Sequence, residues 1–236
     1  MKERILFAWS GGKDSALALY ELLQSQSVEI SGLLTTVTAG YDRVSMHGVR
    51  RSLLERQAES IGLPLDVVTI SQQASNEEYE NRMKELLLRH RARGVSSVAF
   101  GDIHLRAVRD YRERHLARVG MKGIFPLWGK NTGVLARFFI EKGFRAIVTC
   151  VDCRILDRSF AGRIVNDDFL GALPSGIDPG GENGEYHSFV FEAPMFKRSI
   201  PCEAGKVVVR DSFCFCDVVP TIGQLITANG VMSNAH

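Results

Sequence analysis

Apolar runs alternate with amphipathic stretches through the first half of the chain. Short apolar runs that end at glycine or at polar residues predict buried strands over residues 5–9, 30–37, 65–70 and 95–100. Between them, apolar residues three and four positions apart predict helices over residues 16–23, 49–61, 76–91 and 106–119. Strands that alternate with helices form a parallel sheet flanked by helices, so we expect an α/β fold. In such sheets a ligand lies at the carboxyl ends of the strands.

The pattern changes after Gly120. We expect an extended segment over residues 125–128, a helix over 132–142, a strand over 146–151 and a Gly- and Pro-rich loop over 173–184. Residues 189–192, 206–210 and 213–218 indicate β structure, and the last two are spaced for a hairpin. We therefore expect one domain over residues 1–128 and a smaller α+β domain over residues 129–236. Trp128, Phe138 and Phe139 are expected to pack in the core.

The composition of the chain excludes several classes of protein. The chain has 236 residues, 45% hydrophobic and 24% charged, which is ordinary for a folded globular protein and excludes disordered, collagen-like, coiled-coil and disulfide-rich classes. No apolar stretch approaches the ~20 residues of a membrane span. The apolar segment 5–9 is also shorter than the roughly 7–15 residues of a secretory signal. We expect a cytoplasmic protein without a membrane partner.

The cysteines leave two interpretations open. Five cysteines are an odd count, which favours reduced thiols over a disulfide framework. Cys150 with Cys153 and Cys214 with Cys216 could together supply the four ligands of a zinc site. We favour core and pocket packing for these thiols, and metal binding stays the alternative.

Charge is unevenly distributed although the formal net charge is only +2. Residues 82–118 contain ten Lys or Arg and four Asp or Glu. Such a stretch is usually a solvated helix face, here with arginines that can handle anions. The alternative is a surface for a phosphate-rich partner such as tRNA. We favour the first interpretation and do not expect a nucleic-acid partner.

The strongest chemical signal lies between the first predicted strand and the first predicted helix, in the sequence Ser10-Gly11-Gly12-Lys13-Asp14-Ser15. It lacks the spacing of a Walker A loop. Two glycines let the backbone approach a phosphate, and the helix that follows offers free N–H groups and the positive end of its dipole. Serine hydroxyls and a lysine add donors and charge. A carboxylate at Asp14 is suited to phosphate only if Mg²⁺ bridges the two.

Two further groups of residues follow predicted strands. Gly101 and Asp102 come after the fourth strand, so Asp102 is placed to hold Mg²⁺ or a substrate amine, with helix capping as the alternative. His47 and Arg50 follow the second strand and could grip pyrophosphate or a substrate carboxylate. The alternative for this pair is a solvated helix entry.

The Gly-rich loop at residues 180–188 holds carboxylates, an aromatic ring and an imidazole that could form a substrate or ammonium pocket, namely Glu182, Asn183, Gly184, Glu185, Tyr186 and His187. Residues 10–15 resemble the S-G-G-x-D-S signature of PP-loop ATP pyrophosphatases. The 182–188 segment resembles the E-G-G-E-[FY]-E-[TS] motif of the diphthine–ammonia ligase (diphthamide synthase) family within that class. Asn183 stands for a glycine and His187 for a glutamate. The resemblance extends over most of the chain, through Arg106, Tyr111-Arg112 and Pro126-Leu127-Trp128.

The resemblance implies a PP-loop (adenine nucleotide alpha hydrolase-like) fold and an ATP-dependent ligase. Such an enzyme adenylates a carboxylate, releases pyrophosphate and lets ammonia form the amide. Residues 1–128 would bind ATP and residues 129–236 the substrate. Residues 10–15, with Gly101 and the backbone at Thr35 and Thr36, would hold ATP, while Asp14 and Asp102 would hold Mg²⁺. Lys13, Asp14 and Asp102 would be catalytic.

The loop residues Glu182 to His187, with His47 and Arg50, would hold the acceptor and ammonium. The family's named substrate is diphthine on elongation factor 2. The segment 45–50 resembles a variant subgroup associated with bacteria, where diphthamide is not expected, so another protein-borne or small-molecule carboxylate is an open alternative. A PP-loop tRNA-modifying enzyme and a non-enzymatic ATP sensor are the rival functions. The nitrogen donor and the oligomeric state, a homodimer among the options, are not given by the sequence.

Overall fold

The computed structural model describes residues 2–40, 43–44, 48–72 and 74–221. Its elements, in chain order, are β1 (Glu3–Ala8), α1 (Lys13–Ser25), β2 (Val28–Thr38), β3 (Arg43–Val44), α2 (Arg51–Ile61), β4 (Leu65–Ile70), α3 (Asn76–Ala92), β5 (Ser97–Ala99), α4 (Arg106–Ala117), β6 (Lys122–Ile124), α5 (Thr132–Glu141), β7 (Arg145–Asp152), the 3₁₀ turn η1 (Arg158–Phe160), α6 (Asp167–Ala172), β8 (Tyr186–Glu192), β9 (Cys202–Arg210) and β10 (Phe213–Pro220). The predicted α/β fold with a parallel sheet, followed by a smaller α+β region, is confirmed.

The first sheet carries parallel strands in the order β4-β2-β1-β5-β6, with the short β3 antiparallel to the end of β2. Strand β6 was not predicted. The expectation of an extended segment over residues 125–128 is wrong, because the chain turns there: the N–H of Trp128 donates to the carbonyl of Phe125 over 3.2 Å. Pro126 takes the second position of this turn, where its fixed φ favours turning.

The second sheet is antiparallel, in the order β8-β7-β10-β9. The predicted strands 146–151 and 189–192 are present and extend by a few residues as β7 and β8. The predicted hairpin is β9–β10, which turns at Asp211 with a φ of 54°. The loop over residues 173–184 precedes β8 as expected.

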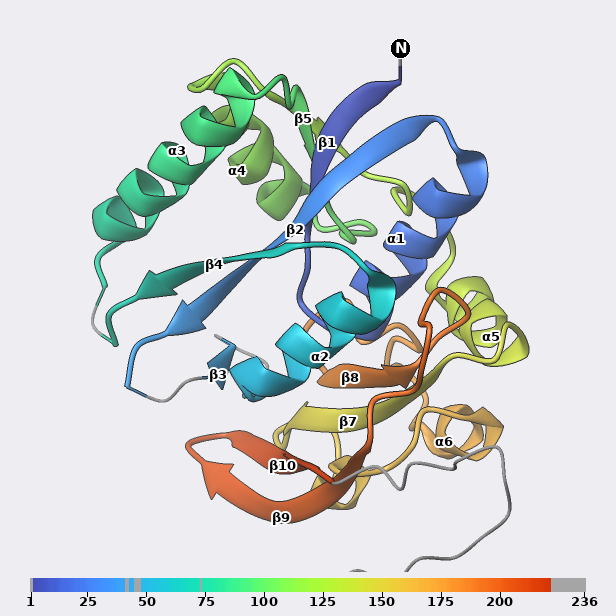
Figure 1. The fold of residues 1–236 in the computed structure, drawn as a ribbon. Coiled ribbons are helices and arrows are strands. Elements are labelled where there is room, and N and C mark those ends of the chain that lie inside the picture. Colours follow the sequence, from blue (N-terminus) through green and yellow to red (C-terminus); the bar gives the residue numbers. More distant parts are fainter. Residues whose placement is uncertain (1, 41–42, 45–47, 73, 222–236) are drawn as a thin grey trace, which may run out of the picture.

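The molecule is layered (Figure 1), with α3 and α4 on one face of the first sheet and α1 and α2 between the two sheets. Alternation along β1 explains this, because Leu6 packs toward α3 and α4 whereas Ile5 and Phe7 pack toward α1 and α2. The larger core also includes Val148 of β7 and Phe189 of β8. One apolar core therefore joins the two sheets and fixes β8 against the start of α1. Phe139 is buried in this core, Phe138 packs at its margin, and Trp128 is half-buried with the Arg109 guanidinium 4.6 Å from its ring centroid.

The cysteine prediction is corrected by a disulfide between Cys153, just past β7, and Cys214 of β10. Antiparallel pairing of β7 with β10 brings these residues together across 61 positions, which the odd count gave no means to see. Cys150, Cys202 and Cys216 are free thiols. Within the described ranges no three His, Cys, Asp or Glu side chains are grouped as a metal site would require, so the four-thiol zinc alternative has no support.

None of the helices in the described part of the chain has both the length and the apolar character needed to cross a membrane.

Candidate active site

The predicted phosphate loop, residues 10–15, lies at the carboxyl end of β1 and leads into α1. Its hydroxyls close the loop on itself: Ser10 Oγ lies 3.0 Å from Ser15 Oγ, and Ser15 Oγ donates to the carbonyl of Gly12 over 2.9 Å. The N–H of Gly12 lies 3.3 Å from Ser10 Oγ. Amides in the first turn of a helix have no partner within the helix, so the start of α1 offers donors to an anion.

Two glycines in the site are required by geometry. Gly11 has a φ of +78°, a conformation that other residues rarely adopt. At Gly101, after β5, an added Cβ would lie 2.8 Å from the backbone carbonyl carbon of Asp14 and 2.8 Å from the backbone nitrogen of Ser15. The Gly101 backbone therefore lies directly against the first turn of α1, which brings the 101–104 segment beside the phosphate loop.

Residues outside the loop hold its backbone. The N–H of Lys13 donates to Ser188 Oγ over 3.2 Å, and the N–H of Val190 donates to the carbonyl of Gly11 over 2.9 Å. Gln57 of α2 also donates to the Gly11 carbonyl, over 3.1 Å. Sequence reasoning assigned no function to Gln57 or Ser188. Gln57 occupies a core-facing position of its predicted helix, but its residue type and spacing do not indicate which groups it contacts.

Lys13 is a buried cation at the loop. Its Nζ lies 2.7 and 2.8 Å from the two carboxylate oxygens of Asp14 and 5.4 Å from the centroid of the Tyr186 ring. Burial alone would lower the pKa of Lys13, but the negative charges of Asp14 and Glu182 nearby raise it above its usual value. Lys13 is therefore a permanent positive charge, and a phosphate would compete with Asp14 for it.

Glu182 connects the loop before β8 to the segment after β5. Its Oε1 accepts from the backbone N–H of Ile103 over 2.8 Å and of His104 over 3.2 Å. Burial raises the pKa of Glu182, and the nearby carboxylate of Asp14 raises it further. Glu182, Asp14 and Lys13 thus form one electrostatic cluster.

Glu185, the second carboxylate of this loop, accepts hydrogen bonds from other residues of the same loop. Glu185 is buried and accepts from the backbone N–H groups of Asp178 and Asn183, at 3.2 and 2.9 Å, and from the Asn183 side chain at 3.0 Å. Tyr186 is also buried, and its hydroxyl donates to the carbonyl of Pro179 over 2.6 Å. Gly184 turns with a φ of +89°. These contacts shape the loop, and the substrate roles of Asn183, Gly184, Glu185 and Tyr186 stay predictions.

His187 of β8 lies within the electrostatic influence of Lys13 and Asp14. Burial lowers its pKa, and the positive charge of Lys13 lowers it further. The imidazole is therefore neutral near pH 7. A neutral imidazole carries no charge, whereas the glutamate of the family motif would carry a negative charge.

Asp102 is engaged by a neighbour on α4. Its Oδ2 lies 2.6 Å from Arg112 Nε and its Oδ1 lies 3.1 Å from Arg112 Nη2. It does not cap α4, which begins after Leu105 without a side-chain cap. The Arg112 guanidinium lies 4.3 Å from the ring centroid of Phe100, so it joins Asp102 to the wall of a cavity.

This cavity, of about 490 Å³, opens beside the phosphate loop between the first sheet and helices α3 and α4. Ligand sites are commonly of this size. Its strand-end wall includes Trp9, Ser10, Thr35 and Thr36, so the residues expected to face adenine do line it. The helix wall is formed by Tyr79, Glu80, Asn81, Met83, Lys84, Leu87, Tyr111, Arg112, His115, Leu116, Arg118 and Val119. Sequence reasoning missed this second wall, because packing of α3 on α4 creates it.

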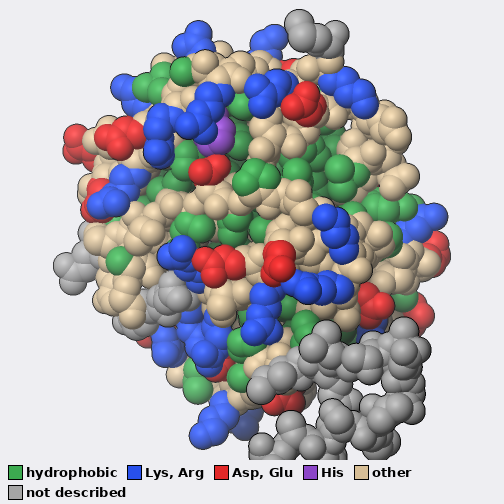
Figure 2. Space-filling view, in the orientation of Figure 1, with side chains coloured by type: hydrophobic (Ala, Val, Ile, Leu, Met, Phe, Trp, Pro, Cys, Tyr) green, Lys and Arg blue, Asp and Glu red, His purple; other side chains and the backbone are tan. Residues whose placement is uncertain are grey.

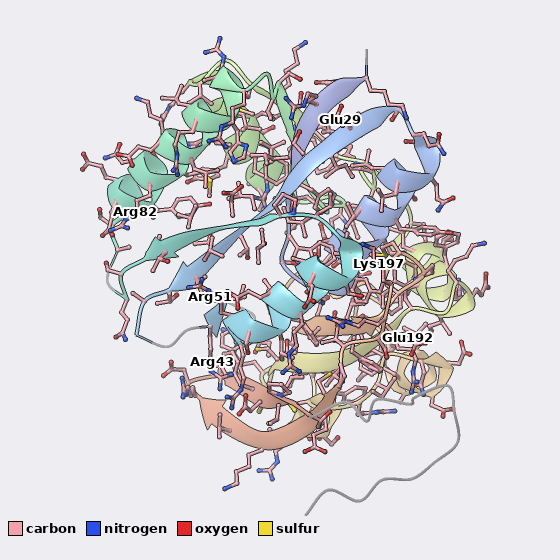
Figure 3. The ribbon with its side chains drawn as sticks, in the orientation of Figure 1. Glu29, Arg43, Arg51, Arg82, Glu192 and Lys197 are labelled. Atoms are coloured by element: carbon pink, nitrogen blue, oxygen red, sulfur yellow. A yellow bond between two sulfur atoms is a disulfide. The ribbon has the colours of Figure 1, made fainter. Side chains whose placement is uncertain are left out.

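Of the two acceptor-binding residues expected after β2, His47 and Arg50, the structure describes only Arg50. His47 lies outside the described residues. Arg50 donates from Nη2 to Oδ2 of Asp217 over 2.6 Å and from Nε to Oδ1 over 3.1 Å, and Arg43 Nη1 lies 2.9 Å from the same Oδ1. Figure 3 shows Arg43 at the β9–β10 hairpin. Asp217 belongs to β10, so Arg50 ties α2 to the second sheet and is not among the residues that line the cavity.

Half of the ten basic residues in the stretch 82–118 are paired with carboxylates. Five of its arginines contact carboxylates within 3.1 Å, namely Arg82 with Glu78, Arg106 with Asp110, Arg109 with Glu113, Arg112 with Asp102 and Arg118 with Glu80. Figure 2 shows positive and negative side chains interspersed on the face that carries α3. This is the pattern of a solvated helix face, the interpretation favoured from sequence.

The donor set fits a Mg²⁺ ion that arrives with a nucleotide. Mg²⁺ is usually held by one or two carboxylates together with phosphate oxygens and water. Asp14 supplies a partly exposed carboxylate at the phosphate loop, whereas Asp102 would have to exchange Arg112 for the ion.

A glycine-rich phosphate loop at the carboxyl edge of a parallel sheet, with acidic residues beside it, defines a nucleotide-binding α/β protein of the PP-loop class. Comparison with known families makes this specific. The diphthamide synthase N-terminal domain matches residues 1–123, and the diphthamide synthase C-terminal domain matches residues 131–219. The chain therefore belongs to the diphthamide synthase family, and it is an enzyme of the ATP-dependent ligase type.

Curated relatives agree over most of the chain. A Diphthine--ammonia ligase of Homo sapiens is 24% identical over 236 residues, which cover 91% of this chain and 88% of the human protein. One of Danio rerio is 26% identical over 235 residues, covering 91% of this chain and 92% of the relative. One of Schizosaccharomyces pombe is 25% identical over 233 residues, 90% of this chain but 38% of that longer protein.

Proposed function

We propose that this protein is an ATP-dependent amide ligase that joins ammonia to a carboxylate through an acyl-adenylate. The observation that carries the proposal is the contact between two loops. The phosphate loop at residues 10–15 is bonded to β8 through Lys13 and Ser188, and β8 directly follows the loop that carries Glu182. A nucleotide on the first loop would therefore lie beside an acceptor on the second.

The proposed reaction has two steps. An oxygen of the acceptor carboxylate attacks the α-phosphorus of ATP, the bond from that phosphorus to the β-phosphate oxygen breaks, and pyrophosphate leaves. Ammonia then attacks the acyl carbon of the adenylate, AMP leaves with the bonding electrons, and a proton is released. Both steps transfer groups between bound substrates, so the protein acts mainly by positioning them and stabilising charge.

The ATP-binding roles follow the positions of the residues. The amides at the start of α1, the hydroxyls of Ser10 and Ser15 and the charge of Lys13 would hold the phosphates, with Gly11, Gly12 and Gly101 keeping the backbone close. The adenosine would enter the cavity of about 490 Å³ beside Thr35 and Thr36. Asp14 and Asp102 would hold Mg²⁺, which when bound supplies positive charge to the leaving pyrophosphate. Arg112, released from Asp102, would then face the cavity.

The acceptor would bind in the smaller domain over residues 129–236, around Glu182 and His187. The first domain, residues 1–128, would hold ATP. Glu182 would orient the acceptor or bind ammonium. Burial lowers the pKa of His187, so its imidazole would line the acceptor pocket as a hydrogen-bonding group without the negative charge of a glutamate. His47 and Arg50 keep a proposed role in acceptor binding through the segment that follows β2.

The acceptor class is proposed from the relatives. Their printed name, Diphthine--ammonia ligase, supports a protein-borne carboxylate and ammonia as substrates. His187 replaces the glutamate of the family motif and so removes a negative charge from the pocket. This supports an acceptor other than diphthine in this chain. A tRNA-modifying enzyme is less favoured, because five of the ten basic residues that motivated it are paired with carboxylates.

A labelling experiment tests the proposal and searches for the acceptor together. The protein is incubated with Mg-ATP and radiolabelled pyrophosphate, without ammonium, in buffer and in small-molecule and macromolecular cell extracts. We expect label to enter ATP in the one fraction that contains the acceptor, and not with Asp14→Ala. Tight ATP binding without exchange in any fraction would favour the sensor. Exchange that depends on RNA in the macromolecular fraction would favour the tRNA enzyme.

A further inference from the structure

The side chain of Gln57 contacts three separate parts of the candidate site. It is fully buried on α2, with 0% of its surface exposed. Its Oε1 accepts from Nε1 of Trp9 over 2.9 Å, and its Nε2 donates to the carbonyl of Gly11 over 3.1 Å and to the carbonyl of Val190 over 2.5 Å. Trp9 lines the cavity, Gly11 lies in the phosphate loop, and Val190 belongs to β8.

The three partners define the chemistry that this position requires. The indole N–H of Trp9 can only donate, so it needs an acceptor, and the two backbone carbonyls can only accept, so they need two donors. A carboxamide supplies one acceptor and two donors. A carboxylate or a thioether of similar length lacks the donors, and a lysine lacks the acceptor. Burial makes each lost partner costly, because water cannot replace it.

The bond to Gly11 sets the direction of a loop amide. The Gly11 carbonyl accepts from both Gln57 Nε2 and the N–H of Val190, so its oxygen is held toward the interior. In a planar trans peptide the carbonyl and the following N–H point in opposite directions. The N–H of Gly12 is therefore directed to the other side, where it lies 3.3 Å from Ser10 Oγ. If this peptide rotated, a carbonyl oxygen would replace an N–H donor at the proposed phosphate site.

We propose that Gln57 is a positioning residue that orients the Gly11–Gly12 peptide for phosphate binding and locks the phosphate loop to β8. The inference rests on the proposed ATP-dependent function and adds a residue outside its motifs. It also explains how the acceptor loop stays in register with the nucleotide, because Val190 and Ser188 on one strand both bond to the phosphate loop. The simpler alternative is a polar core residue that stabilises the fold and has no particular effect on phosphate.

Binding of three ligands separates these interpretations. Calorimetry with Mg-ATP, Mg-pyrophosphate and adenosine probes the whole site, the phosphate loop alone and the cavity alone. We expect Gln57→Leu to weaken Mg-ATP and Mg-pyrophosphate binding by about tenfold or more, since more than one hydrogen bond is lost. Adenosine affinity should change by no more than about threefold, the effect of one neutral hydrogen bond at Trp9. Gln24→Leu, the same change at an exposed position of α1, is the matched control.

Gln57→Glu keeps the size of the side chain and gives a second, pH-dependent test. Its ionised form would place a carboxylate against two carbonyls, so it should weaken Mg-pyrophosphate binding at pH 8. Protonation restores one donor, so affinity relative to wild type should recover several-fold as the pH falls toward 5.5. This series decides the question if Gln57→Leu does not fold, and circular dichroism checks the fold of each variant.

Each outcome bears on one claim. Folded Gln57 variants with wild-type affinity for Mg-pyrophosphate would overturn the positioning role. Equal losses for adenosine and Mg-pyrophosphate, with no pH-dependent recovery of Gln57→Glu, would also overturn it and leave a role in the fold alone. A wild-type protein that binds neither Mg-ATP nor Mg-pyrophosphate would instead overturn the proposed function, and this inference with it.

Discussion

The backbone N–H of Lys13 donates to Oγ of Ser188 over 3.2 Å, across 175 positions of the chain. This bond occupies an amide at the start of α1 and attaches it to the strand after the acceptor loop. Replacing Ser188 with Ala should weaken Mg-ATP binding about threefold to tenfold, because one hydrogen bond that positions Lys13 is lost. Calorimetry checks this, with the exposed Ser27→Ala as control. Unchanged affinity in a folded Ser188→Ala protein would show that the contact does not serve the nucleotide.

Substitutions at the Lys13–Asp14 pair should affect the stability of the protein and its activity differently. Asp14→Asn leaves the buried Lys13 with a weaker partner, so we expect the free energy of unfolding to fall by about 1–3 kcal/mol. The double variant Lys13→Met/Asp14→Asn removes the buried charge as well and should recover part of this loss. Neither variant should form AMP from ATP. Urea denaturation and a product assay measure the two effects, and a double variant that regains activity would contradict the assigned roles.

The contact of Asp217 with Arg50 and Arg43 should contribute stability that depends on pH. Hydrogen bonds from the Arg50 side chain hold the pKa of Asp217 below its usual value, so the carboxyl stays ionised in the folded protein under conditions where it protonates in the unfolded chain. The contribution is therefore complete above the unfolded pKa of about 3.9 and is lost as the pH falls through the lower folded value. We expect Asp217→Asn to lower the free energy of unfolding by about 1 kcal/mol between pH 7 and pH 5.

Urea denaturation of Asp217→Asn at pH 7, 5 and 4 measures this difference. The gap from wild type should be constant between pH 7 and 5 and should begin to shrink near pH 4. Asp211→Asn makes the same chemical change at the neighbouring hairpin turn, where φ is 54° and asparagine is well tolerated. A gap that grows on acidification would contradict the sign of the Asp217 shift.

Thiol counting checks the disulfide. With Cys153 and Cys214 joined, denatured protein kept free of reductant should titrate three thiols, and five after reduction. Reduction should also lower the free energy of unfolding by about 2–4 kcal/mol, because the bond closes a loop of 61 residues. In the folded protein Cys150 should resist alkylation, since burial raises its pKa to about 12. Five thiols without reductant would show that the bond does not form in solution.

Local pattern predicted most of the fold. The runs at β1, β2 and β4 and the stripe of α3 are long and regular, so periodicity identified them within a few residues. Strand β6 has three residues, one of them Gly123, and is recognised only by its pairing with β5. Residues 125–128 were expected to be extended, but Pro126 favours the turn that forms there.

The candidate site was predictable where a short motif carries the chemistry and not where folding assembles it. The motifs at residues 10–15 and at Glu182 were visible in the sequence, and Asp14 lies close enough to Glu182 to raise its pKa. The pairing of Asp102 with Arg112 and the use of Glu185 within its own loop depend on how a short segment folds, which the residue types do not specify. The contacts of Gln57 depend on residues that are distant in sequence. A glutamine on a helix has no sequence signature for three simultaneous hydrogen bonds, so only the packed structure identifies it.

The products of ATP turnover test adenylation most directly. The protein is incubated with Mg-ATP, ammonium and the extract fraction that supports pyrophosphate exchange, and the products are resolved by phosphorus NMR. AMP and pyrophosphate should appear in a one-to-one ratio, and Asp14→Ala should give neither. ADP and orthophosphate as the sole products would contradict cleavage between the α and β phosphates, and with it the proposed ligase mechanism.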